Sequence, residues 1–254
     1  MKILPVVSVN SNYLPLGIRC KASWDYFHPD IPMHIVNLDD WCGYIREIGE
    51  EPKYISWQYS AFVGLFYAIQ KMMVNKYDLL VFLDADTVVT GICNEMFTDD
   101  YMTAVSLNFD DGYVWYNAGV WASRDIEFIK EFWHKHITTH EEDNHLFMNI
   151  LTNRKDKLKV LDGDGSGVWY NERSREWWNR LEVRDNKLYT PDREVKILHW
   201  AGGRHPMTDK MSCSLFSPVV KQWLNKITCG STFTDYDGKL YGRIITSIYN
   251  LGVV

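Results

Sequence analysis

The sequence predicts an α/β domain with a mostly parallel central sheet that is flanked by helices. Short runs of β-branched and apolar residues alternate with longer segments whose apolar residues recur at helical spacing. The run Leu79–Leu83 is apolar without interruption, which is typical of a central strand covered on both faces. No linker-like shift in composition divides the 254 residues, so we expect a single domain over residues 1–254.

Each expected element follows from a local pattern. The expected strands are short apolar runs: Ile3–Val9, Met33–Leu38, Leu79–Leu83, Thr103–Asn108, Gly119–Ala122 and Val195–His199. The expected helices are longer and amphipathic: Leu14–Phe27, Gln58–Val74, Ile126–His136, Glu142–Leu151 and Lys239–Val253. The sequence His28-Pro29-Asp30 ends the first helix, because proline disfavours helical backbone in the residue before it.

The composition excludes several classes of protein. The chain has 27 Lys and Arg against 33 Asp and Glu, and this acidic balance argues against broad binding to nucleic acid or anionic membranes. No stretch approaches the roughly 20 apolar residues of a membrane span, and the N-terminus does not resemble a signal peptide. The five cysteines form no Cys-x-x-Cys pair, which favours free thiols in a reducing compartment and a cytoplasmic protein.

An acidic motif follows the apolar run Leu79–Leu83. Asp84 and Asp86 are two residues apart, so in an extended chain their carboxylates point to the same side. Ligands of open α/β sheets bind outside the carboxyl ends of the strands, where these residues are expected. Two adjacent carboxylates repel each other unless they share a proton or a cation. A hard divalent ion with oxygen ligands would satisfy both and could also bind the phosphates of a substrate.

Two classes of enzyme carry an acidic motif of this kind. Asp84-Ala85-Asp86-Thr87 resembles the first motif of haloacid-dehalogenase-like phosphatases, in which Asp84 would be the nucleophile and Asp86 a general acid or base. Asp162 and Asp164 could then supply the late acidic pair of that family. The phosphatase motif normally lies on the first strand, however, whereas here two strands and two helices are expected before it. The other class is the GT-A glycosyltransferases, whose Asp-x-Asp motif binds a metal ion.

Several further motifs, in the right order, resemble family 8 of the GT-A glycosyltransferases. They are Asn10-Ser11-Asn12-Tyr13 after the first strand, His28-Pro29-Asp30, Asn117-Ala118-Gly119-Val120, Asp143-Asn144-x-x-Phe147 and Ile197-Leu198-His199-Trp200-Ala201-Gly202. The resemblance implies a Rossmann-like, nucleotide-sugar-binding GT-A domain, with residues 1–107 as the nucleotide-binding half and residues 108–254 as the acceptor-side half.

The resemblance also implies roles for individual residues. Those around the base and ribose of the donor would be Val9, Asn10, Asn12 and Tyr13. Asn117 would face the donor sugar, while Asp143 and Asn144 would lie near the reacting carbon. Asp84, Asp86 and His199 would be the metal ligands, with Gly202 three residues beyond the histidine. One nitrogen ligand favours Mn²⁺ over Mg²⁺.

The chain departs from the family in three places. Where the family has Lys-Pro-Trp, this chain has His205-Pro206-Met207, so Arg204 or His205 would have to hold the diphosphate. The helix before the acidic motif lacks the usual arginine at Tyr59–Val63, although Lys71 follows later on that helix. Asn144 stands where the family has glutamine.

The expected function is metal-dependent transfer of a sugar from a nucleotide-diphosphate sugar, with a UDP-sugar as the expected donor, to a hydroxyl of a glycan or other acceptor. The resemblance implies retention of configuration, with Asp143 as the nucleophile if the reaction is a double displacement. An inverting enzyme would need a base, for which Asp110 and Asp111 are candidates. The alternatives are the phosphatase and a nucleotide-sugar-binding protein without turnover.

The aromatic content, 15% of the residues, is high. Sugar rings pack on aromatic side chains, so we expect a group of aromatic residues in the second half to line the acceptor side: Trp115, Tyr116, Trp169, Tyr170, Trp177 and Trp178.

Overall fold

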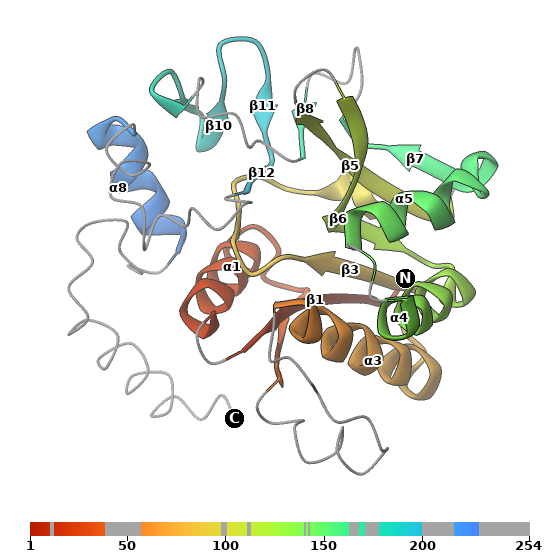
Figure 1. The fold of residues 1–254 in the computed structure, drawn as a ribbon. Coiled ribbons are helices and arrows are strands. Elements are labelled where there is room, and N and C mark those ends of the chain that lie inside the picture. Colours follow the sequence, from red (N-terminus) through yellow and green to blue (C-terminus); the bar gives the residue numbers. More distant parts are fainter. Residues whose placement is uncertain are drawn as a thin grey trace, which may run out of the picture.

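The computed structural model describes residues 1–10, 13–38, 57–97, 101–110, 113–139, 141, 143–162, 168–170, 178–199 and 216–228 (Figure 1). Its helices are α1 (Leu14–Phe27), α3 (Trp57–Asn75), α4 (Ile126–Thr139), α5 (Asp143–Thr152) and α8 (Pro218–Ile227), with short 3-10 turns η1 (Asn94–Phe97) and η2 (Lys155–Lys157). The strands are β1 (Ile3–Val9), β2 (His34–Asn37), β3 (Leu79–Leu83), β4 (Thr87–Val89), β5 (Thr103–Asp110), β6 (Tyr113–Ser123), β7 (Leu158–Val160), β8 (Val168–Trp169), β9 (Glu182–Arg184), β10 (Lys187–Tyr189), β11 (Glu194–Val195) and β12 (Ile197–His199).

A six-stranded sheet forms the centre of the fold, in the order β2-β1-β3-β6-β5-β7. The pairs β1–β2, β1–β3 and β5–β7 are parallel, and β6 runs antiparallel to both of its neighbours. The predicted fold class, an α/β domain with a mostly parallel sheet, is confirmed. The boundary expected between the two halves, at residues 107 and 108, lies inside β5.

The sheet has a core on each face because successive side chains of a strand point to opposite sides. Leu80 and Phe82 of β3 face a core built with α3, α4 and α5, whereas Val81 and Leu83 face a core built with α1. The ribbon shows the same arrangement, with α3 and α4 on one side of the sheet and α1 on the other (Figure 1). The uninterrupted apolar pattern of Leu79–Leu83 is thus explained by burial on both faces.

Most of the predicted elements are present, several with ends shifted by one to three residues, and two differ more. The predicted strand Gly119–Ala122 is part of the longer β6. The predicted strand Val195–His199 is divided into β11 and β12, which belong to different sheets. The division falls at Lys196, whose carbonyl accepts a hydrogen bond from the Thr90 amide. The predicted helix Lys239–Val253 lies outside the described residues.

A third core lies beside the sheet and was not predicted. It joins Val88 of β4 and Leu198 of β12 to the four-stranded sheet β8-β11-β10-β9 and to the apolar face of α8. Ser217 begins α8 by accepting the Val220 amide, as an N-cap residue does. None of the described helices is long and apolar enough to cross a membrane.

Candidate metal and donor site

Three strand ends bring Asp84, Asp86 and His199 together. Asp84 follows the last residue of β3, and Asp86 precedes Thr87, the first residue of β4. β4 pairs antiparallel with β12, and this pairing places His199 opposite Thr87. The turn between the strands is closed by Thr87, whose amide and hydroxyl both donate to the Asp84 carbonyl. The sequence motif did not assign a role to Thr87, although threonine is a common turn residue.

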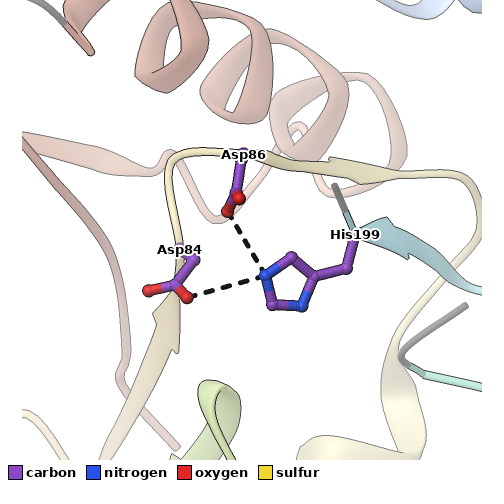
Figure 2. A group of neighbouring side chains, drawn as sticks. All are labelled: Asp84, Asp86 and His199. Atoms are coloured by element: carbon purple, nitrogen blue, oxygen red, sulfur yellow. Dashed lines mark ion pairs between the residues drawn. The ribbon is translucent and has the colours of Figure 1, made fainter. Parts of the chain in front are cut away.

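The three side chains converge on one point, as Figure 2 shows. His199 Nε2 lies 3.6 Å from Asp84 Oδ2 and 3.3 Å from Asp86 Oδ1. One ligand atom from each residue lies within 4.8 Å of the others. The His199 side chain is 2% exposed, that of Asp86 14% and that of Asp84 44%, so the site opens to solvent on the side of Asp84.

The charge of the site is set by the two aspartates. Burial lowers the pKa of His199, but the Asp86 and Asp84 carboxylates more than offset burial and raise that pKa to about 9. Without a bound cation, His199 is therefore protonated at neutral pH, and its positive charge forms ion pairs with the Asp84 and Asp86 carboxylates. A divalent cation would take the place of that proton, because metal ligation requires neutral imidazole.

Gly119 of β6 forms the inner wall of the site. A Cβ atom at this position would lie 2.0 Å from Asp84 Oδ2 and 3.1 Å from His199 Cε1. The Asp84 amide in turn donates to the Gly119 carbonyl at 2.7 Å. The sequence pattern carried a signal for this, since an isolated glycine in a strand often marks a close approach of another group.

The donor atoms suit a hexacoordinate cation. Ligands about 2.1 Å from an octahedral ion are ~3 Å apart when adjacent and ~4 Å apart when opposite. The three ligand atoms lie within 4.8 Å of one another, and the lack of a side chain at Gly119 leaves room for the Asp84 carboxylate in this group. Two carboxylate donors and one imidazole donor could together hold a divalent cation of this kind.

Those predicted donor-binding residues that belong to the described part of the chain lie at the edge of the sheet that carries the acidic motif. Val7 of β1 is opposite Leu83 of β3, so Val9 and Asn10 lie beside the acidic motif. The Val9 side chain is buried against Gly17. Asn10 is buried, and its carbonyl and Oδ1 both accept the Tyr13 amide. Of the other predicted donor contacts, Asn12, Gly202, Arg204 and His205 lie outside the described residues.

Two of the residues predicted to lie near the donor sugar, Asn117 and Asn144, accept hydrogen bonds from main-chain amides of β6. Asn117 Oδ1 accepts the Gly119 amide at 2.8 Å, and Asn144 Oδ1 accepts the Ala118 amide at 3.0 Å. Asp143, the first residue of α5, accepts the Asn144 amide at 2.9 Å. The structure thus groups the start of α5 with the wall of the metal site.

Lys71, the cation that follows the position of the missing family arginine on α3, lies away from the acidic motif. This residue lies four residues before the end of α3, which leads into the start of β3, whereas the acidic motif follows the end of β3. Lys71 therefore lies toward the opposite edge of the sheet, where its ammonium group is 5.4 Å from the centre of the Tyr67 ring.

Two aromatic residues predicted to line the acceptor side belong to cores instead. Tyr170 and Trp178 are each 1% exposed, in the α1-side core and in the third core respectively. Trp115 and Tyr116 are half-buried on β6. The side chains of Trp169 and Asp110, and the residues Asp111 and Trp177, lie outside the described part of the chain.

Asp162 has a structural role. Its carboxylate is fully buried and accepts the amides of Leu107 and Tyr170, so it ties the segment after β7 to β5 and to the end of β8. A carboxylate engaged in this way is not available for the late acidic pair of a phosphatase. The other member of the pair, Asp164, lies outside the described residues.

Comparison with known proteins identifies the fold. No protein-family model and no curated protein sequence matches the chain. Among solved structures, the glycosyltransferase GlyE of Streptococcus pneumoniae TIGR4 matches 97% of this chain with a TM-score of 0.56 and 17% identity, and the match spans 65% of GlyE. A glycosyltransferase involved in glycosylation of the major capsid of PBCV-1 matches 82% of this chain and 98% of its own, with a TM-score of 0.54 and 10% identity.

An active-site mutant of LgtC is similar as well, with a TM-score of 0.51, 15% identity and coverage of 91% of this chain and 97% of its own. At such identities a likeness establishes the fold, and these matches extend over most of the chain. The chain therefore has the GT-A fold that these glycosyltransferases share, as its sequence predicts.

Proposed function

We propose that this protein is a metal-dependent glycosyltransferase that transfers a sugar from a nucleotide-diphosphate sugar to a hydroxyl of a glycan or other acceptor. One observation carries the proposal: Asp84, Asp86 and His199 converge at the carboxyl edge of a sheet with the GT-A fold. This edge is where ligands bind in open α/β sheets. The fold and the donor set thus point to the same class of reaction.

The residues of the site would have three separate roles in binding the metal ion, the nucleoside and the diphosphate. Asp84, Asp86 and His199 would hold Mn²⁺ or Mg²⁺, which acts as a Lewis acid on the diphosphate leaving group. Asn10 and Tyr13 would bind the base and ribose of the donor, for which a UDP-sugar is the expected compound. Arg204 or His205 would add positive charge at the diphosphate.

The stereochemical course proposed is retention. In a front-face reaction, the leaving phosphate accepts the proton of the acceptor hydroxyl, so no protein base is required. In a double displacement, Asp143 would attack the anomeric carbon from below the sugar ring. The position of Asp143 at the first turn of α5, next to the segment that carries Gly119, supports a place near the donor sugar.

Two alternatives are less well supported. A phosphatase with Asp84 as nucleophile would need a late acidic pair, and Asp162 is occupied by two main-chain amides. A nucleotide-sugar-binding protein without turnover would have the same fold and the same metal site. Activity separates this binder from the transferase.

The test is hydrolysis of nucleotide sugars, a slow side reaction of glycosyltransferases, in the presence of Mn²⁺. We expect the wild-type protein to release UDP from at least one UDP-sugar, and Asp86→Ala to lose this activity. Asp156→Ala is the matched control, because Asp156 is exposed in η2. Hydrolysis of p-nitrophenyl phosphate without any response to nucleotides would contradict the proposal. Metal-dependent UDP binding without hydrolysis of any nucleotide sugar would favour the binding protein.

A further inference from the structure

The wall of the metal site is a bulge in β6. Val105 of β5 pairs with Trp121 and Leu107 pairs with Tyr116, so Ser106 alone lies opposite residues 117–120. Side-chain packing shows the same irregularity. Ala118 packs in the core with α3, α4 and α5, and Val120 packs in the core with α1, although residues two apart on a regular strand share a face. Bulges of this kind re-aim strands next to functional sites.

The bulge loses regular pairing with β5, and side chains replace the missing partners. The Gly119 amide is bound by Asn117, and the Val120 carbonyl accepts the Ser106 hydroxyl at 2.9 Å. The Ala118 carbonyl accepts the Trp121 indole at 2.7 Å. These three partners belong to the sheet itself. The Ala118 amide is bound by Asn144, which comes from α5.

We propose that Asn144 is a positioning residue for the metal site, not a catalytic residue. By accepting the Ala118 amide, it holds the bulge in the conformation that seats Gly119 against Asp84 and His199. The inference rests on the proposed metal site and gives Asn144 a role distinct from the place near the reacting carbon that the family resemblance implies. Its side-chain oxygen is engaged with the main chain, 3.0 Å from the amide nitrogen.

Loss of the hydrogen bond from the Ala118 amide to Asn144 would alter the contact between Gly119 and Asp84. Gly119 is already in contact with Asp84, because even a Cβ atom there would lie 2.0 Å from the carboxylate. If the Ala118 amide loses its acceptor, the bulge must turn to find another, and Gly119 moves with it. The carboxylate of Asp84 would then no longer be confined to the position that faces His199. Loss of Asn144 should therefore weaken metal binding, even though Asn144 is not a ligand.

The experiment compares Mn²⁺ binding by the wild type and by Asn144→Leu, which has a similar volume but no acceptor. Binding is followed by electron paramagnetic resonance of free and bound Mn²⁺, well below the melting temperature. We expect the dissociation constant to rise about tenfold and the bound-Mn²⁺ spectrum to change, as for other residues that orient metal ligands indirectly. The matched control, Asn149→Leu, changes an exposed residue of the same helix and should alter the constant by less than about twofold.

Two further variants test the acceptor itself. Asn144→Asp keeps an acceptor oxygen and should restore Mn²⁺ affinity to near the wild-type value, whereas Asn144→Ser, with a shorter side chain, should bind weakly. The serine variant also serves if Asn144→Leu does not fold. The inference is overturned if Asn144→Leu binds Mn²⁺ with unchanged affinity and spectrum, whatever its melting temperature. It is also overturned if Asn144→Asp binds as weakly as Asn144→Leu.

The outcomes separate this inference from the proposed function. A wild-type protein that binds no Mn²⁺ or Mg²⁺ would overturn both. A wild-type protein that binds Mn²⁺ but transfers no sugar would overturn the proposed function, and the Asn144 variants would still decide the inference. Unchanged Mn²⁺ affinity with lost turnover in Asn144→Leu would place the residue at the reacting carbon instead.

Discussion

At the scale of single residues, Gly119 bounds the candidate metal site formed by Asp84, Asp86 and His199. Gly119→Ala would place a methyl group 2.0 Å from Asp84 Oδ2 and 3.1 Å from His199 Cε1, so the Asp84 carboxylate would have to leave the position in which it faces His199. We expect the affinity for Mn²⁺ to fall by about tenfold or more, measured by titration calorimetry. The control is Gly91→Ala, whose methyl group would meet the Lys196 side chain at 2.9 Å and has no metal ligand among its nearest neighbours. Equal losses of Mn²⁺ affinity in Gly119→Ala and Gly91→Ala would contradict this prediction.

Protonation of His199 gives a second prediction at this scale. Its pKa is raised to about 9 from an ordinary value of 6.5, so its ion pairs with Asp84 and Asp86 stabilise the metal-free protein fully below pH 6.5. That stabilisation is lost as the pH rises through about 9. Because Mn²⁺ must displace the proton, its affinity should rise by about tenfold per pH unit between these values.

At pH 7.5 we expect about one proton to be released per Mn²⁺ bound, which calorimetry in buffers of different ionisation enthalpy measures. His199→Ala should bind Mn²⁺ more weakly and without this proton release. If proton release were the same in His199→Ala, another group would be responsible.

At the scale of elements, close contact between α3 and β1 supports the edge of the sheet that carries the site. A Cβ atom at Gly64 would lie 2.6 Å from the Ser8 Cβ and 3.2 Å from Phe82 Cε2. Gly64→Ala should therefore lower the free energy of unfolding by about 1–3 kcal/mol, despite the higher helix propensity of alanine. Urea denaturation measures this. The control Gln70→Ala, at an exposed position of α3, should change it by less than about 0.5 kcal/mol.

Sequence patterns predicted the elements better than the way they pair. Ile3–Val9, Leu14–Phe27 and Leu79–Leu83 match the structure at both ends, because the strands are short, mainly apolar runs and His28-Pro29-Asp30 ends the helix. The division of Val195–His199 between two sheets was not predictable from that run. It depends on where β4 and β8 lie, and these are remote in sequence.

At the scale of the whole molecule, the candidate metal site lies between the central sheet and the third core. His199 and Leu198 are adjacent residues of β12, and Leu198 packs in the third core with α8. Asp84 directly follows the last residue of β3 in the central sheet. A ligand that binds only the folded protein at 100 times its dissociation constant adds about 2.7 kcal/mol. We therefore expect saturating Mn²⁺ to raise the melting temperature by about 5–10 °C in scanning calorimetry.

Asp86→Ala should abolish this rise, and Asp156→Ala, the exposed control, should retain it. A rise that persists in Asp86→Ala would show that the ion stabilises the protein from another place. Removal of metal by a chelator should return the wild-type protein to the melting temperature of the metal-free form.

The sequence by itself determined the fold class and the acidic end of β3, because apolar periodicity and the Asp84-Ala85-Asp86 spacing are local properties of the chain. The family resemblance added His199, which the structure brings within 4.8 Å of the aspartates. The tertiary structure decided the rest. Tyr170 and Trp178 are core residues because of what packs around them, and Gly119 and Asn144 acquire their roles in a bulge that exists only when β5, β6 and α5 are assembled. Burial, register and close approach depend on partners distant in sequence, and no local pattern specifies them.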